Sequence, residues 1–123
     1  MENIENAIID SVELSMEDHG CLTLLLSVSG YGWGCSVGGY VLGHGFVGAK
    51  NFTGCAKGIE EIMRVMDTVG VSKFSDLKGK YIRVVIENNS IKKFGHIIED
   101  KWFDYNEFYS NGEEIMRATN AER

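Results

Sequence analysis

The segment AIIDSVELSMEDHGCLTLLLSVS, residues 7–29, decides the fold class of the chain. Its first part alternates, placing on one face Ile8, Val12, Leu14 and Met16, and its second part does the same with Leu22, Leu24, Leu26 and Val28. A two-residue period is typical of a strand with one buried face. The short polar turn EDHG joins the two parts, so the segment predicts an antiparallel hairpin.

More strands follow on both sides of a glycine-rich region. A third strand is expected over residues 34–42, where Gly38-Gly39 indicates a bulge or a close approach by another backbone or a ligand. Strands 80–87 and 90–99 flank Asn88-Asn89, a pair that tolerates the positive φ of a tight hairpin turn.

One helix is expected over residues 54–69. Its apolar stripe recurs with helical spacing at Cys55, Ile59, Ile62, Met63, Met66 and Val69. Thr53 is the candidate N-cap and Gly70 the left-handed residue after the helix. The opposite face is expected to be solvated and carries Lys57, Glu60, Glu61, Arg64 and Asp67.

The remaining segments complete a single domain over residues 1–123. VSKFSDLKG predicts a turn or one helical turn ending at Gly79, residues 100–110 a partly helical aromatic segment, and residues 111–123 a short tail. We expect an α+β fold in which an antiparallel sheet of five to six strands packs with one main helix and a short C-terminal helix. Residues 1–6 and 118–123 are expected to be frayed.

Composition limits the functional classes. The chain has 123 residues, 44% hydrophobic and 24% charged, with a net charge of −6. No basic cluster favours DNA or RNA, and no apolar run is long enough to cross a membrane. The start MENIENAII carries glutamates where a signal peptide has basic residues, so we expect a cytoplasmic protein.

The stretch GHGFVG matches the spacing G-x-G-x-x-G at Gly43, Gly45 and Gly48. A dinucleotide site needs these glycines between a parallel strand and the helix it opens, whereas the strands here read as antiparallel and the helix begins several residues later. We therefore interpret residues 43–48 as a flexible connection between the third strand and the helix.

The sequence offers little support for catalysis, a metal or a cofactor. Cys21, Cys35 and Cys55 lack metal-site spacing and are expected to be small buried hydrophobic residues. His19 near Cys21 lies in an acidic turn, which does not activate a thiol. We predict no catalytic residue, no metal and no cofactor.

Groups suited to binding are more numerous. Many aromatic residues lie near turns and element ends, and these can stack on a nucleobase or pack in the core or an interface: Trp33, Phe46, Phe52, Phe74, Phe94, Trp102, Phe103 and Tyr105. The candidates for phosphate recognition are Arg64, Arg83 and Arg117, because a planar guanidinium can donate two hydrogen bonds to one phosphate.

Four segments of the chain carry a resemblance to a known family: SMEDHGCLTLLLSV, GWGCSVGGYVLG, GIEEIMRVMDTVGVSKFSDLKGKYIRV and FGHIIEDKWFD. In this order they resemble the small phage and prophage proteins of the first Thoeris anti-defence family. The likeness runs from about Ile8 to Asp104. It implies a homo-oligomer, a dimer or an assembly of dimers, that binds a cyclic ADP-ribose-type immune signal without degrading it. Some relatives also sequester cyclic oligonucleotides.

The resemblance, together with residue chemistry, suggests a ligand site. Arg64 and Arg83 would contact phosphate or ribose, Phe74 and Trp102 would stack, and Asn88 or Asn89 would bind hydroxyl groups. Arg117 would close over the ligand as a lid, and the pocket walls would include Met16 and Phe46. The alternative is a small acidic inhibitor that acts by direct contact with a host enzyme.

Overall fold

The computed structural model describes residues 3–16 and 20–110. The elements are β1 (Asn3–Met16), β2 (Cys21–Gly30), β3 (Trp33–His44), β4 (Thr53–Gly54), α1 (Ala56–Val69), the 3₁₀ turn η1 (Phe74–Leu77), β5 (Tyr81–Glu87), β6 (Ser90–His96), β7 (Trp102–Phe103) and α2 (Tyr105–Ser110). The expected tail, with Arg117, and the candidate His19 lie outside the described residues.

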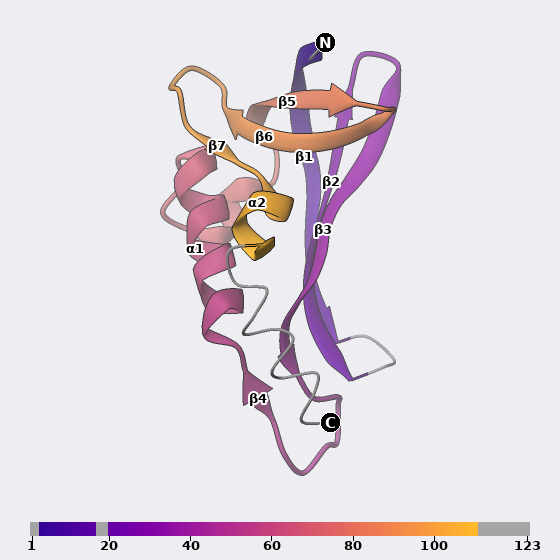
Figure 1. Ribbon diagram of the computed structural model, residues 1–123, viewed down its shortest axis with the longest axis vertical. Helices are drawn as coiled ribbons and strands as arrows, with labels where there is room; N and C mark the ends of the chain where they lie inside the picture. Colours follow the sequence, from indigo (N-terminus) through magenta and orange to yellow (C-terminus); the bar gives the residue numbers. More distant parts are fainter. Residues whose placement is uncertain (1–2, 17–19, 111–123) are drawn as a thin grey trace.

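The strands form one antiparallel sheet in the order β4-β3-β2-β1-β5-β6-β7, which curls into a half-barrel. Figure 1 shows the long strands β1 to β3 on one side, the β5–β6 hairpin across one end of them, and α1 along the sheet. The expected α+β class, with one main helix and a short C-terminal helix, is confirmed. The sheet has seven strands, more than the five to six expected. The difference arises because β4 and β7 have two residues each and are too short to show a two-residue period in the sequence.

The β1–β2 hairpin is confirmed, but β1 differs from its expected pattern. Residues 3–6 are paired with β5 instead of frayed. The pairing with β2 shifts between Ile9 and Ser11, and such a bulge reverses the alternation of faces. Ile9 is therefore fully buried, whereas Ile8 is half-buried and Leu14 and Met16 are 49% and 42% exposed.

The glycine pair of β3 forms the expected bulge. Gly38 and Gly39 have φ of 105° and 84°, and the pairing of β2 with β3 is irregular between Thr23 and Leu25. A β-carbon on Gly38 would lie 2.5 Å from the carbonyl oxygen of Leu24, so β2 approaches this position too closely for any side chain.

The β5–β6 hairpin and the turn before it also agree with the sequence. Asn88 and Asn89 have φ of 53° and 63°, the left-handed values of a tight hairpin turn. The single helical turn is η1, and Gly79 follows it with φ of 87°.

The helix α1 starts later than predicted. Cys55, with extended backbone and no side-chain cap, occupies the N-cap position, and Thr53 belongs to β4. Because Gly43 of β3 pairs with Gly54 of β4, it is part of the sheet, and only residues 45–52 form the connecting loop. Gly70, with φ of 93°, ends the helix as expected and donates its N–H to the carbonyl of Met66.

The buried face of α1 differs most from the prediction. Ile59 and Met63 are 56% and 59% exposed, whereas Glu61 is fully buried. The cause is Gly58, which lies against the backbone of Leu42 and turns its own side of the helix toward the sheet. Glu61 and Val65 follow Gly58 at helical spacing and face the core with it.

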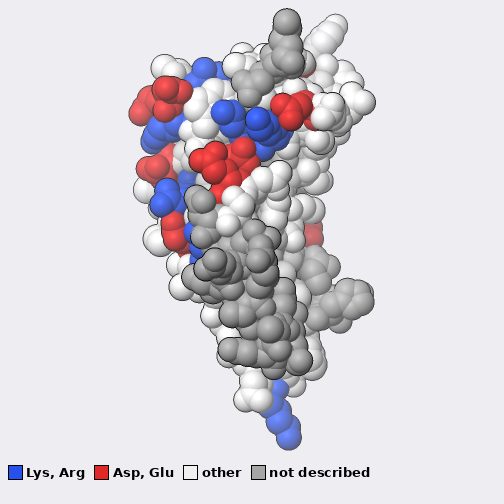
Figure 2. Space-filling view, in the orientation of Figure 1, with Lys and Arg blue, Asp and Glu red and all other residues white. Residues whose placement is uncertain are grey.

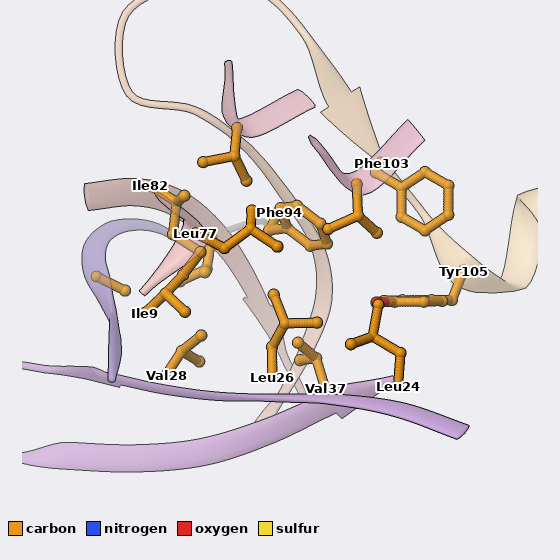
Figure 3. Close-up of a cluster of buried hydrophobic side chains, with 14 of the residues drawn as sticks. Ile9, Leu24, Leu26, Val28, Val37, Leu77, Ile82, Phe94, Phe103 and Tyr105 are labelled. Carbon is orange, nitrogen blue, oxygen red and sulfur yellow. The ribbon is translucent and has the colours of Figure 1, made fainter. Parts of the chain in front are cut away.

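The core lies between the concave face of the sheet and the helices. Figure 3 shows Ile9, Leu24, Leu26 and Val28 from the long strands meeting Phe94, and Phe103 beside Tyr105. The cysteines do not belong to this core. The three are free thiols and only half-buried: Cys21, Cys35 and Cys55. Each lies at or near the start of a strand or helix, away from the centre of the sheet.

Candidate ligand-binding site

A cleft of about 380 Å³ opens between α1, β7 and α2. We call it the α1–α2 cleft, and its lining residues are Lys57, Glu60, Arg64, Lys93, Trp102, Phe103, Asp104, Glu107 and Phe108. On the face drawn in Figure 2, basic and acidic side chains gather over the region of α1 and the β6–β7 segment. The cleft therefore combines charge of both signs with aromatic rings.

Local structure explains why these residues meet. Lys57, Glu60 and Arg64 are spaced by three and four residues, so they form one stripe along α1. On the other side, Asp104 begins α2 by accepting a hydrogen bond from the backbone N–H of Glu107, 3.2 Å from its Oδ1. This cap directs Phe108 toward the stripe.

The position of Trp102 depends on a glycine in the neighbouring strand, Gly95. It lies opposite Gly95 in the β6–β7 pairing, and a β-carbon on Gly95 would lie 2.5 Å from Cε3 of the indole. The indole ring thus lies against the backbone of β6 at Gly95. Its Nε1 donates to Oδ1 of Asp100 at 2.8 Å, which fixes the orientation of the ring.

Cations lie over two of the three aromatic rings that line the cleft, Phe108 and Trp102. Lys57 Nζ is 4.0 Å from the centroid of the Phe108 ring, and the Arg64 guanidinium carbon is 5.8 Å from it. Lys93 Nζ is 5.3 Å from the centroid of Trp102. Such contacts hold positive charge beside an aromatic surface.

Arg64 is held on its own helix but remains accessible. Its Nε lies 2.6 Å from Oε2 of Glu60, and 59% of the Arg64 side chain is exposed. The hydrogen bond from Arg64 lowers the pKa of Glu60, so the carboxylate stays ionised at neutral pH. A ligand phosphate would compete with this carboxylate for the guanidinium.

Arg83 lies behind Trp102 and supports the site. Its Nε donates to the carbonyl of His96 and its Nη2 to the carbonyl of Glu99, each at 2.8 Å. The guanidinium carbon is 4.8 Å from the Trp102 centroid. Arg83 is absent from the lining of the cleft, so the structure favours a supporting role over the expected direct contact.

The other predicted residues lie elsewhere. Phe74 is half-buried and packs against the core. Asn89 lines a separate pocket of about 420 Å³ together with Trp33, and Asn88 precedes it in the hairpin turn. Met16 lies at the end of β1 and Phe46 in the 45–52 loop, both exposed and neither lining the cleft. Of the predicted residues that the structure describes, Arg64 and Trp102 line the cleft, with Arg83 behind Trp102.

The sequence reasoning missed Lys57, Lys93 and Phe108. The helical spacing of Lys57 and Arg64 is visible in the sequence and places them on one face. Lys93 and Phe108 carry no such signal, because only the curl of the sheet brings β6 near α2.

The cysteines and histidines of the described residues give no sign of a catalytic or metal site. Cys21 Sγ lies 4.0 Å from His44 Nδ1 across β2 and β3. Within residues 3–16 and 20–110, no three His, Cys, Asp or Glu side chains are placed to hold a metal ion. No helix in this part of the chain is long and apolar enough to cross a membrane.

Comparison with known proteins adds no relative. No protein-family model matches the chain, and neither the curated proteins nor the solved structures contain a match. The likeness to the Thoeris anti-defence proteins therefore rests on the sequence segments quoted above.

Proposed function

We propose that the protein binds a cyclic ADP-ribose-type signalling nucleotide in the α1–α2 cleft and releases it unchanged. By holding the signal, a cytoplasmic homo-oligomer of this chain would keep it from its downstream effector. The observation that supports this proposal best is the convergence of Lys57, Arg64 and Lys93 on two aromatic rings in one cleft. The resemblance in sequence supplies the identity of the ligand.

The chemistry of the cleft matches the parts of such a nucleotide. Lysine and arginine donate strong hydrogen bonds to the charged oxygens of a pyrophosphate. An aromatic face such as Trp102 stabilises a stacked base by about 1–3 kcal/mol. Asp104 and Glu107 provide acceptors for ribose hydroxyl groups at the α2 side of the cleft.

Sequestration depends on affinity and slow release. The protein lowers the free signal only if its sites outnumber the signal molecules and if dissociation is slow on the time scale of the immune response. A chemical step is not part of this proposal, and the ligand should be recovered intact.

A second candidate is direct contact with a host enzyme. The observation that favours it is an exposed apolar loop at the end of the molecule opposite the β5–β6 hairpin, where Phe46, Val47 and Phe52 are 55%, 87% and 59% exposed. Apolar side chains gathered on a surface are typical of protein contacts.

Thermal unfolding with cyclic ADP-ribose isomers and cyclic dinucleotides separates the two candidates. A ligand at 100 times its Kd stabilises the folded state by about 2.7 kcal/mol. The melting temperature should rise with one nucleotide, and chromatography of the heated sample should return that nucleotide unchanged. A processed product would indicate an enzyme instead.

The variants Arg64→Ala and Lys78→Ala provide the matched comparison. Both remove one exposed positive charge, but Lys78 follows η1 and does not line the cleft. Arg64→Ala should weaken binding by about tenfold or more, the value of a charged hydrogen bond. Absence of a shift with every nucleotide, or equal effects of both variants, would contradict the proposal and leave the protein-contact candidate.

A further inference from the structure

Glu61 is a fully buried carboxyl group at the contact between α1 and α2. Oε1 accepts a hydrogen bond from the hydroxyl of Tyr109 on α2. Within the described part of the chain, Oε2 has no hydrogen-bond partner, and neither does the buried hydroxyl of Tyr105. A buried carboxyl group with one free oxygen is costly when charged and much less costly when protonated.

In the described part of the chain, the groups that act on the Glu61 carboxyl are aromatic, and none of them is a cation. Tyr40 of β3 stacks between Tyr105 and Tyr109, with ring centroids 5.2 and 4.6 Å away. The titratable groups that interact with this cluster are Cys55 at the start of α1 and Asp104 before α2, together with the tyrosines themselves. The nearby cations Lys57 and Arg64 lie over the Phe108 ring on the outer side.

These surroundings set the protonation of the carboxyl group. Burial raises the pKa of Glu61 to about 7, although the hydrogen bond from Tyr109 lowers it in part. The carboxyl group therefore changes charge within the physiological range while it is enclosed. Once ionised, it gains hydration if α2 moves away from α1.

We propose that the enclosure of Glu61 by α2 is a proton-dependent latch: α2 docks on α1 when the carboxyl is neutral and is released when it is ionised, because the cost of a buried charge exceeds the gain in the hydrogen bond from Tyr109. The latch adjoins the α1–α2 cleft, because Phe108 lies next to Tyr109 and Glu60 next to Glu61. An open latch removes Phe108 and Glu107 from the cleft. That the release weakens nucleotide binding rests on the proposed function, whereas the latch itself does not.

Amide hydrogen exchange of residues 105–110 tests the latch without a ligand. After correction for intrinsic exchange, protection in the unaltered chain should fall by about tenfold between pH 6 and pH 8, as expected for a group that titrates near 7 only when docked. In Glu61→Gln, which keeps the shape and cannot ionise, protection should not change with pH. Asp67→Asn, which removes an exposed carboxylate from the same helix, should behave as the unaltered chain.

A carboxyl-carbon NMR titration of Glu61 in the unaltered chain gives a second measurement that needs no variant. A midpoint near 7 supports the latch, and a midpoint below 5.5 overturns it. Protection that is independent of pH in the unaltered chain, or a Glu61→Gln profile that follows it, also overturns the latch. A confirmed latch in a chain that no nucleotide stabilises would refute the proposed function alone.

Discussion

Gly58 of α1 lies directly on the backbone of Leu42 in β3. A β-carbon at Gly58 would lie 2.5 Å from the Cα and 2.6 Å from the carbonyl oxygen of Leu42. Neither atom belongs to a flexible side chain that could move away. This contact sets the rotation of α1, and through it the burial of Glu61 and the exposure of the stripe formed by Lys57, Glu60 and Arg64.

Gly58→Ala should destabilise the protein, although alanine favours a helix over glycine by about 1 kcal/mol. The clash with Leu42 forces α1 away from β3, and overpacking of this kind costs about 1–3 kcal/mol or more. Gly54→Ala is the control, because no atom lies within 4 Å of a β-carbon there. Urea denaturation should show a lower free energy of unfolding for the first variant only; a more stable Gly58→Ala would contradict the role of this contact.

The sequence predicted the positions of the helices and strands better than it predicted which of their faces are buried. Alternation in β2 and the Asn88-Asn89 turn are local signals, and the structure agrees with them, whereas the bulge in β1 moves its buried face to Ile9. The face of α1 was wrong because hydrophobic periodicity takes no account of a glycine that permits close packing. Gly58 interrupts no helical pattern, so its effect appears only in three dimensions.

The candidate site was predictable only in part. Arg64 and Trp102 were selected for their chemistry, and both line the cleft. Arg83 was selected for the same reason, but the backbone carbonyls of His96 and Glu99 engage it. Such carbonyl contacts depend on how the β6–β7 loop folds back, which no residue pattern shows.

Gly38→Ala should be more destabilising than Gly39→Ala. Both positions have positive φ, which disfavours a side chain at each. Only Gly38 also meets the carbonyl oxygen of Leu24, at 2.5 Å from its would-be β-carbon, whereas at Gly39 the nearest atom is Leu25 Cδ1 at 3.8 Å. Thermal unfolding of the two variants measures the difference, and equal losses would mean that backbone strain alone determines the effect.

Arg83→Ala should lower the free energy of unfolding by about 1–3 kcal/mol, because it leaves the carbonyls of His96 and Glu99 without their charged donor. Arg64→Ala should change stability by less than about 1 kcal/mol, as is usual for an exposed ion pair. The loss of Arg83 should also change the fluorescence of Trp102, measured with Trp33 replaced by Phe. If neither the fluorescence spectrum nor the free energy of unfolding changes, Arg83 does not support Trp102 and is available to contact the ligand directly.

Glu61 should make the protein more stable in mild acid than at alkaline pH. Its pKa in the folded state, about 7, lies above its ordinary value of 4.5. Folding therefore takes up a proton between these values, and the stabilisation is fully present below pH 4.5 and is lost as the pH rises through 7. The free energy of unfolding of the unaltered chain, relative to Glu61→Gln, should fall by about 2–3 kcal/mol between pH 5 and pH 8.

Urea denaturation of both proteins at several pH values measures this difference, and the comparison cancels the titration of the other carboxyl groups. Tyr109→Phe gives an independent check on the sign. The hydrogen bond from Tyr109 lowers the pKa of Glu61, so its removal should shift the loss of stability to higher pH. A relative stability that rises with pH would show that the carboxyl group is ionised in the folded state. A shift toward acid in Tyr109→Phe would show that the Tyr109 hydroxyl stabilises the neutral carboxyl group, contrary to the expected direction.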